Sequence, residues 1–298
     1  MSMNSGDEPQ QARFKFIICL SPGRSGTKYL AKIFSSCSSV RAFHEPDPKL
    51  SCPRFAQGEL DDAENDRRIA AKVEAMFALA EAGGACHCHV ETDHTILHLR
   101  WQEVTEKLLQ GLKSHERLGV VILRRNLAEV VKSRLELGHG TLYYKNKIAR
   151  VRGIGWIYSP DSSACELKLP KLFSGGGDCA EEKEAMTPMD IVCGYVLNVE
   201  KVAENFIRKY SRNTKIGIFD TTIDSINEVE SVRRMMQAFN LHVNDADLAN
   251  VVGKRVNERT SEKNQACKRF QSSSFSVDDC KRGLLAYRKL LAQENRNK

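Results

Sequence analysis

The sequence predicts an α/β protein with a three-layer fold, in which a central parallel sheet is flanked by helices. Two observations lead to this expectation. Short apolar runs alternate along the chain with longer segments whose apolar residues recur at helical spacing. The chain has 298 residues, of which 41% are hydrophobic and 28% charged, the composition of a globular protein. Strands that alternate with helices favour a parallel sheet with helices on both faces.

The individual elements follow from the apolar pattern and from the residues that interrupt it. The first strand is expected at residues 14–21, because a continuous apolar run is typical of a central parallel strand. Pro46 is expected to stop the second strand, and Gly83 with Gly84 to end the second helix. The expected strands are 14–21, 40–45, 87–92, 119–125 and 215–220. The expected helices are 29–37, 69–82, 101–112, 127–137, 189–210 and 226–239.

The predicted domain organisation is a single unit. Residues 1–13 are polar, carry Asp7 and Glu8 and are expected to be a disordered N-terminus without a signal peptide. Residues 14–298 are expected to form one domain. Within it, residues 138–186 lose the pattern and are rich in Gly, Ser and Pro, so this stretch is expected to be an insertion that shapes a substrate pocket.

The net charge of +7 is unevenly distributed. The last 45 residues hold 12 Lys and Arg against 5 Asp and Glu, whereas the first 253 hold 33 of each. This favours an anionic partner at the C-terminal segment, although a solvated basic helix would give the same count. No aromatic-rich basic stripe accompanies it, so nucleic acid is not the expected partner. No apolar run reaches the roughly 18 residues of a membrane span, and a cytoplasmic location is expected.

Ten cysteines in a chain of this size without a signal peptide predict reduced thiols. Cys86, His87, Cys88 and His89 resemble a metal motif. A single CxC lacks the second ligand pair of structural zinc sites, and its alternation is also that of a buried strand. We therefore expect no metal.

The strongest local motif is Ser21-Pro22-Gly23-Arg24-Ser25-Gly26-Thr27-Lys28-Tyr29, between the first strand and the first helix. Two glycines allow the backbone to approach a ligand, and the amides at a helix N-terminus favour an anion. The motif differs from that of nucleotide triphosphatases. Its glycines are three residues apart, Lys28 follows Gly26 by two places, and Tyr29 stands where a metal-binding hydroxyl should be.

This motif resembles the phosphosulfate loop of sulfotransferases that use 3′-phosphoadenosine 5′-phosphosulfate (PAPS), which have a P-loop NTPase-like fold. Their loop reads Arg/Lys-Ser-Gly-Thr-Thr after the first strand. Arg24 to Thr27 match it, and Lys28 replaces the second Thr. The resemblance implies PAPS as co-substrate and the following residues as its ligands: Gly23, Arg24, Ser25, Gly26, Thr27 and Lys28.

A second family motif lies about 100 residues later. In these sulfotransferases an Arg at the end of a strand and a Ser eight residues on bind the 3′-phosphate of the cofactor. Here Arg125 follows an apolar strand, and Ser133 stands eight residues further along the expected helix. A guanidinium suits phosphate well. The resemblance therefore assigns Arg125 and Ser133 to the 3′-phosphate.

The candidate base is Glu45, in His44-Glu45-Pro46 at the end of the second strand. Alternation would send His44 and Glu45 to opposite faces, and Pro46 should hold Glu45 extended at the carboxyl edge of the sheet. Sulfotransferases acting on protein tyrosines or trehalose use a glutamate in this region as base. The competitor is His94, since the cytosolic group uses a His in a Lys-Thr-His segment there. Glu91 replaces that Lys and Asp93 is inserted.

The resemblance extends more faintly to the C-terminal segment. Lys254 and Arg255 open the basic stretch and are candidates for closing the cofactor site. The implied reaction is in-line transfer of a sulfuryl group to a small-molecule hydroxyl or amine, with Glu45 as base and Arg24 stabilising the leaving group. The alternatives are a nucleotide kinase-like phosphotransferase and a non-catalytic protein that binds a nucleotide or polyanion.

Overall fold

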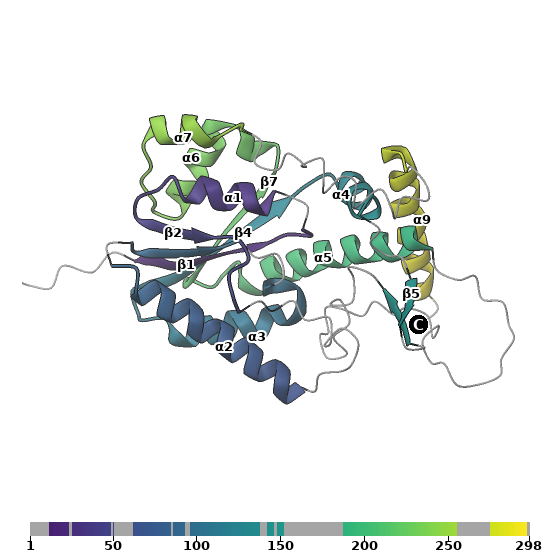
Figure 1. Cartoon of the computed structure of the whole chain (residues 1–298), viewed down its shortest axis with the longest axis horizontal. Helices are drawn as coiled ribbons and strands as arrows, with labels where there is room; N and C mark the ends of the chain where they lie inside the picture. The colour runs from purple at the N-terminus through teal and green to yellow at the C-terminus, as the bar shows by residue number, and fades with distance from the viewer. Residues whose placement is uncertain are drawn as a thin grey trace, which may run out of the picture.

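The computed structural model describes residues 12–23, 26–48, 50, 62–84, 86–92, 96–137, 142–145, 148–151, 187–254 and 275–296. It confirms the predicted α/β class. Five parallel strands form a central sheet in the order β2-β3-β1-β4-β7, with helices on both faces (Figure 1). The strands of this sheet are β1 (Arg13–Leu20), β2 (Val40–Phe43), β3 (Cys88–Glu91), β4 (Glu116–Arg124) and β7 (Ile216–Thr222).

Each face of the sheet has its own apolar core. One core packs the sheet against three helices, which are α1 (Thr27–Phe34), α6 (Val229–Ala238) and α7 (Asp245–Val251). The short 3-10 helix η2 (Ser225–Asn227) lies on the same side, with Ile226 buried in that core. The opposite core packs the sheet against three others, which are α2 (Asp62–Glu81), α3 (Ile96–Gly111) and the C-terminal part of α5 (Pro188–Tyr210). Strands buried on both faces explain the continuous apolar runs of β1 and β4.

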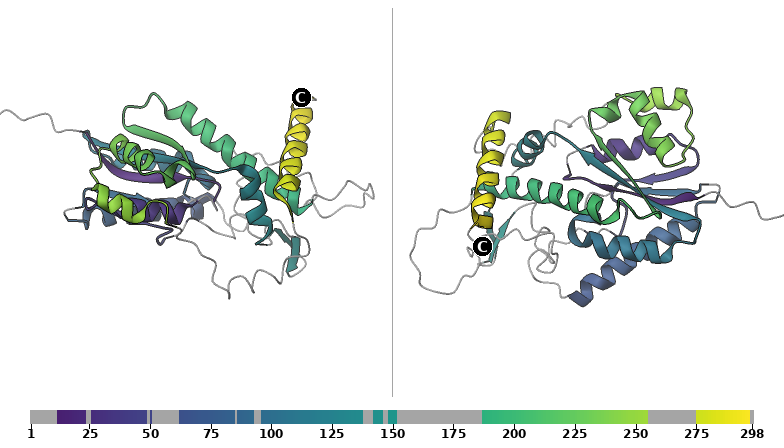
Figure 2. Two further views of the ribbon diagram at one scale, coloured as in Figure 1. Left: turned by 90° about the horizontal axis from the view of Figure 1, so that it is seen from above. Right: turned by 180° about the vertical axis from the view of Figure 1, so that it is seen from behind.

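A third apolar cluster lies beside the sheet, where α4 (Leu127–Leu135), the first half of α5 and α9 (Val277–Arg296) pack together (Figure 2). Cys280, Leu284 and Tyr287 of α9 are buried there, so this basic helix is not merely solvated. An antiparallel pair, β5 (Leu142–Lys145) and β6 (Ile148–Val151), follows α4 and belongs to the stretch expected as an insertion. Residues 1–11, and the rest of 138–186, lie outside the described residues.

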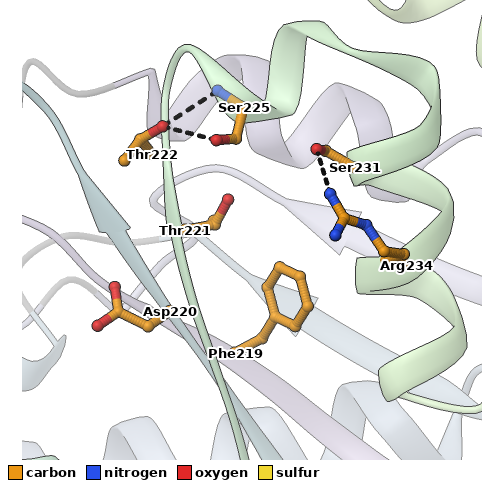
Figure 3. A pocket seen from close by; sticks show the side chains of 7 residues that line it. All are labelled: Phe219, Asp220, Thr221, Thr222, Ser225, Ser231 and Arg234. Atoms are coloured by element: carbon orange, nitrogen blue, oxygen red, sulfur yellow. Dashed lines mark hydrogen bonds between the residues drawn. The ribbon is translucent and has the colours of Figure 1, made fainter.

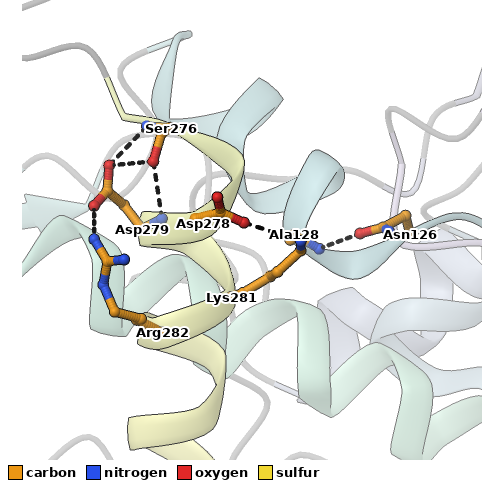
Figure 4. Close-up of polar contacts among 7 residues, drawn as sticks. All are labelled: Asn126, Ala128, Ser276, Asp278, Asp279, Lys281 and Arg282. Atoms are coloured by element: carbon orange, nitrogen blue, oxygen red, sulfur yellow. Dashed lines mark hydrogen bonds and ion pairs between the residues drawn. The ribbon is translucent and has the colours of Figure 1, made fainter.

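Two helices of this third cluster, α4 and α9, begin at the side-chain caps that Figure 4 shows. Asn126 accepts a hydrogen bond from the N–H of Ala128 at 3.0 Å and starts α4 directly after β4. Ser276 and Asp279 exchange hydrogen bonds at the start of α9, in the pattern of a capping box. The Asn126 cap fixes where α4 begins, and therefore how its residues lie relative to the end of β4.

All the strands and helices expected from periodicity are present, with ends that differ by up to seven residues. The largest difference is at α2, which begins at Asp62 rather than at residue 69. The second strand ends at Phe43 rather than at residue 45. Among the described residues, α7 and the β5–β6 pair were not expected, and α9 was considered only as the alternative of a solvated basic helix. None of the helices within the described residues combines the length and apolar character that crossing a lipid bilayer requires.

Candidate functional site

The turn between β1 and α1 lies at the carboxyl edge of the sheet, at its centre. Strand β1 pairs with β3 on one side and β4 on the other. Gly23 has φ 69° and Gly26 has φ 85°, both in the left-handed region that favours glycine. A Cβ on Gly26 would lie 2.3 Å from Cδ1 of Ile223, the residue after β7. The left-handed conformation therefore favours glycine at position 26, and a larger residue would also force the end of the Ile223 side chain to move.

Helix α1 starts directly from this turn. Gly26 is its N-cap residue and provides no side-chain cap; the first helical hydrogen bond runs from Leu30 N to Gly26 O at 2.9 Å. The first N–H groups of a helix have no partner within it, and they carry the positive end of the helix dipole. The side chain of Thr27 is buried and that of Lys28 is exposed. Arg24 and Ser25 lie outside the described residues.

Arg124 ends β4 and Arg125 follows it, and the two arginines have different surroundings. Arg124 donates to both carboxylate oxygens of Asp220 on β7, at 2.8 and 2.9 Å, and to Glu200 on α5. Its hydrogen bonds to Asp220 raise the pKa of Arg124 above its ordinary value. Burial raises the pKa of the Glu200 carboxyl, and Arg124 offsets part of that shift. Arg124 thus ties three elements together.

Arg125 instead faces α4. Its Nε and Nη2 lie 3.0 and 2.9 Å from Oε2 of Glu129, one helical turn away. Ser133 follows Glu129 by another turn, so Glu129 and Ser133 share one face of α4. The structure therefore brings Arg125 and Ser133 toward one face, with an acidic residue between them. Sequence reasoning missed Glu129, although the i,i+4 spacing from Arg125 was a usable signal.

Glu45 lies at the same edge of the sheet, but its predicted local structure is wrong. Its φ is 52°, so the backbone is left-handed rather than extended. Because β2 ends at Phe43, strand alternation does not separate His44 from Glu45: His44 Nε2 lies 3.8 Å from Glu45 Oε1, and both side chains are partly exposed. His44 Nδ1 is 3.3 Å from both the O and the Oγ1 of Thr92, after β3.

A buried network of charged and polar side chains contacts the segment that contains His44 and Glu45. Lys72 of α2 lies 2.7 Å from Oε2 of Glu91 on β3 and donates to the carbonyl of Pro46 at 3.1 Å. The Nε2 of His89 lies 2.9 Å from the other carboxylate oxygen of Glu91. At most 1% of the Lys72, His89 and Glu91 side chains is exposed. Sequence reasoning missed Lys72, because a lysine on a charged helix is expected to be solvated.

Of the remaining candidates, the structure describes Lys254 but not His94 or Arg255. Lys254 is exposed and follows Gly253, whose N–H donates to the hydroxyl of Tyr29 in the first turn of α1 at 2.8 Å. Burial raises the pKa of the Tyr29 hydroxyl, and this hydrogen bond offsets part of the rise. The start of the basic segment is therefore held close to α1. Both His94 and Arg255 lie outside the described residues.

A polar pocket of about 290 Å³ lies beside the end of β7 (Figure 3). Thr222 Oγ1 and Ser225 Oγ are 2.9 Å apart on one side of it, and Arg234 of α6 donates to Ser231 at 3.0 Å on the other. Hydroxyls, a guanidinium and the carboxylate of Asp220 line it together with the ring of Phe219, so the pocket suits a polar group. The seven lining residues are Phe219, Asp220, Thr221, Thr222, Ser225, Ser231 and Arg234. In the sequence, this pocket could have been predicted from Asp220, Thr221 and Thr222, the polar residues that directly follow the apolar run 216–219.

Among the described residues, no group of three or more His, Cys, Asp or Glu side chains is arranged to hold a metal ion. The six cysteines in the described part of the chain are free thiols. Cys88 and His89 lie in β3, whose four residues are all buried. Burial raises the pKa of the Cys88 thiol well above its ordinary value.

The fold and the site define an α/β protein whose first strand leads through a two-glycine turn into a helix at the carboxyl edge of a parallel sheet. No protein-family model matches the sequence, and no curated protein matches it. Among solved structures, a sulfotransferase domain from the curacin biosynthetic pathway is similar to this chain, with 13% sequence identity and a TM-score of 0.44. The match covers 85% of this chain and 83% of that one.

Proposed function

We propose that this chain is a sulfotransferase, which transfers a sulfuryl group from PAPS to a hydroxyl or amine acceptor. The main support for the proposal is that two candidate phosphate-binding elements, the Gly23 turn and Arg125, follow the ends of neighbouring strands. Leu20 of β1 pairs with Ile122 of β4, and Gly23 and Arg125 each follow three residues beyond that pair. Neighbouring strands lie about 4.8 Å apart, so both elements are within reach of one nucleotide.

The donor has two anionic groups, a 5′-phosphosulfate and a 3′-phosphate, and each has its own candidate site. The turn with Gly23 and Gly26 offers backbone N–H groups and a helix N-terminus to the 5′-group. In the proposal Arg24, Ser25, Thr27 and Lys28 add side-chain contacts to that group.

The 3′-phosphate is assigned to Arg125 and Ser133. The guanidinium of Arg125 would exchange its present partner, Glu129, for the phosphate. Lys254 and Arg255 would close over the nucleotide. The hydrogen bond between Tyr29 and Gly253 supports this role for Lys254, since it holds the start of the basic segment near α1.

Glu45 is the proposed base. The acceptor oxygen forms a bond to sulfur while its proton passes to the Glu45 carboxylate. The bond from sulfur to the bridging oxygen breaks, and its electron pair leaves with 3′,5′-adenosine bisphosphate. Arg24, Lys28 and the amides of the turn would stabilise the charge that develops on the leaving oxygen.

The position of Glu45 agrees with this role. Strand β2 is two places from β1, about 10 Å across the sheet, which leaves room for an acceptor between Glu45 and the donor. Left-handed backbone at a non-glycine residue costs free energy and is concentrated at functional sites. His94 follows β3, directly beside β1, and remains the alternative base or an acceptor contact.

The proposal is tested by incubating the purified chain with sulfur-35-labelled PAPS and separate panels of alcohols, phenols and amines. We expect label in one acceptor class, with release of an equal amount of adenosine bisphosphate. Tight bisphosphate binding without transfer to any acceptor would favour the non-catalytic alternative. Phosphoryl transfer from ATP would favour the kinase-like one.

A further inference from the structure

The carbonyl oxygen of Pro22 is the last backbone acceptor before the Gly23 turn, and two buried side chains converge on it. Arg134 of α4 donates to it through Nη2, and the Tyr195 hydroxyl of α5 donates to it at 2.7 Å. Arg134 Nη2 also donates to the Tyr195 oxygen at 2.7 Å. We call this closed set of hydrogen bonds the Pro22 clamp. Its partners come from 112 and 173 residues further along the chain.

The clamp is enclosed by protein. Arg134 is 2% exposed and Tyr195 is fully buried. The guanidinium also lies over the Tyr195 ring, 4.0 Å from its centroid. Burying a guanidinium is costly unless its N–H groups are hydrogen-bonded, so the two hydrogen bonds from Nη2 restrict where this side chain can lie. A side chain under that constraint holds the backbone that it contacts in one place.

The clamp lies directly behind the turn that the proposed function assigns to the 5′-phosphosulfate. If the Pro22 carbonyl shifts, the amides that follow it shift too, because the peptide planes are linked. The positive charge of Arg134 also favours an anion in front of the turn. The next residue toward the N-terminus of α4 is Ser133, a candidate ligand of the 3′-phosphate. Helix α4 therefore carries residues relevant to both anionic groups.

We propose that Arg134 and Tyr195 are positioning residues: by holding the carbonyl of Pro22, they set the turn at Gly23 and Gly26 for a 5′-phosphoryl group. This inference rests on the proposed function for the identity of the ligand. The claim that Arg134 and Tyr195 hold the turn rigid does not depend on the proposed function. The rigidity of the turn and the identity of the ligand can be measured separately.

The first experiment compares Arg134→Lys and Tyr195→Phe with matched controls by calorimetric titration. Tyr210→Phe is the control for tyrosine, since Tyr210 is also buried on α5 but packs at its other end, against Trp101. Arg117→Lys is the control for arginine, since its guanidinium lies over the Phe14 ring near the start of β4. The ligands are 3′,5′-adenosine bisphosphate, 5′-AMP and 3′-AMP.

We expect both clamp variants to bind the bisphosphate and 5′-AMP about three- to tenfold more weakly, the range that one lost hydrogen bond gives. Affinity for 3′-AMP, which has no 5′-phosphate, should be unchanged, and both controls should bind all three ligands as the parent does. Equal weakening for all three ligands, or no weakening for any, would overturn the positioning role.

Amide hydrogen exchange without ligand provides the second readout. Exchange at Gly23, Gly26 and Thr27 should be faster in both clamp variants and unchanged in Tyr210→Phe. Unchanged exchange in the clamp variants would contradict the claim that Arg134 and Tyr195 hold the turn in place. If the parent protein binds no adenosine bisphosphate at all, the proposed function and the ligand assigned to the turn fail, while the exchange measurement still decides whether the clamp holds the turn.

Discussion

The hydroxyl oxygen of Tyr29 accepts a hydrogen bond from the backbone N–H of Gly253 at 2.8 Å, although 224 residues separate them in the sequence. The same hydroxyl donates to the carbonyl of Ile226 at 3.2 Å. One side chain in the first turn of α1 therefore connects the glycine turn with η2 and with the start of the basic segment. This connection places Lys254 near the candidate nucleotide site.

Tyr29→Phe is expected to remove both hydrogen bonds while keeping the buried ring. It leaves an N–H and a carbonyl without their partner, so unfolding free energy should fall by about 1–3 kcal/mol in urea denaturation. Affinity for adenosine bisphosphate should also fall, because the segment with Lys254 loses its attachment. Tyr210→Phe is the control. Loss of stability with unchanged bisphosphate affinity would show that Lys254 does not close over the nucleotide.

Arg125→Ala is expected to weaken binding of 3′,5′-adenosine bisphosphate by about 10-fold or more and to leave 5′-AMP binding nearly unchanged. A charged hydrogen-bonded contact contributes about 1.5–3 kcal/mol, and only the bisphosphate has the 3′-phosphate. Calorimetric titration of both ligands measures the difference. Equal weakening of the two would contradict the assignment.

Glu129→Gln provides the complementary test. Glu129 holds Arg125 in the absence of ligand, and an exposed ion pair contributes about 0.2–1 kcal/mol. Its removal should strengthen bisphosphate binding by up to about fivefold and leave 5′-AMP unaffected. Weaker binding of the bisphosphate would mean that Glu129 orients Arg125 rather than competing for it.

The parts of the candidate site that could be predicted from the sequence each depend on residues close together in the chain. The glycine turn follows from two glycines between an apolar run and a helix, and the spacing of Arg125 and Ser133 follows from one helix. The Pro22 clamp was not predictable, because Arg134 and Tyr195 reach Pro22 from distant helices. Glu45 was expected to be extended because it precedes a proline. Contacts from elsewhere, Lys72 on Pro46 and Thr92 on His44, accompany a left-handed backbone instead.

Lys72→Met is expected to destabilise the protein by about 3–5 kcal/mol, because it leaves the buried carboxylate of Glu91 without its cation. Adding Glu91→Gln should recover much of the loss, since glutamine is neutral and can still hydrogen-bond His89. Lys201→Met, at an exposed position on α5, is the control and should change stability by less than about 0.5 kcal/mol. If Lys72→Met costs no more than this control, the buried ion pair contributes nothing.

Glu45→Gln is expected to reduce turnover by about 10²–10⁴-fold, the usual contribution of a general base, while bisphosphate binding stays nearly intact. Glutamine keeps the size and polarity of the side chain but is not a proton acceptor. His94→Asn should have a smaller effect, chiefly on KM for the acceptor. Steady-state assays on the acceptor found in the labelling experiment measure both. A fully active Glu45→Gln with an inactive His94→Asn would assign the base to His94.

The central claim is that the site binds a nucleotide with a 3′-phosphate and needs no metal to do so. Thermal denaturation with 3′,5′-adenosine bisphosphate, compared with ATP plus Mg²⁺, tests it most directly. A ligand at 100 times its dissociation constant stabilises the folded state by about 2.7 kcal/mol, which raises the melting temperature by several degrees. We predict that shift with the bisphosphate, unchanged by EDTA, and little shift with ATP and Mg²⁺. A large shift with ATP and Mg²⁺ and none with the bisphosphate would contradict the sulfotransferase proposal.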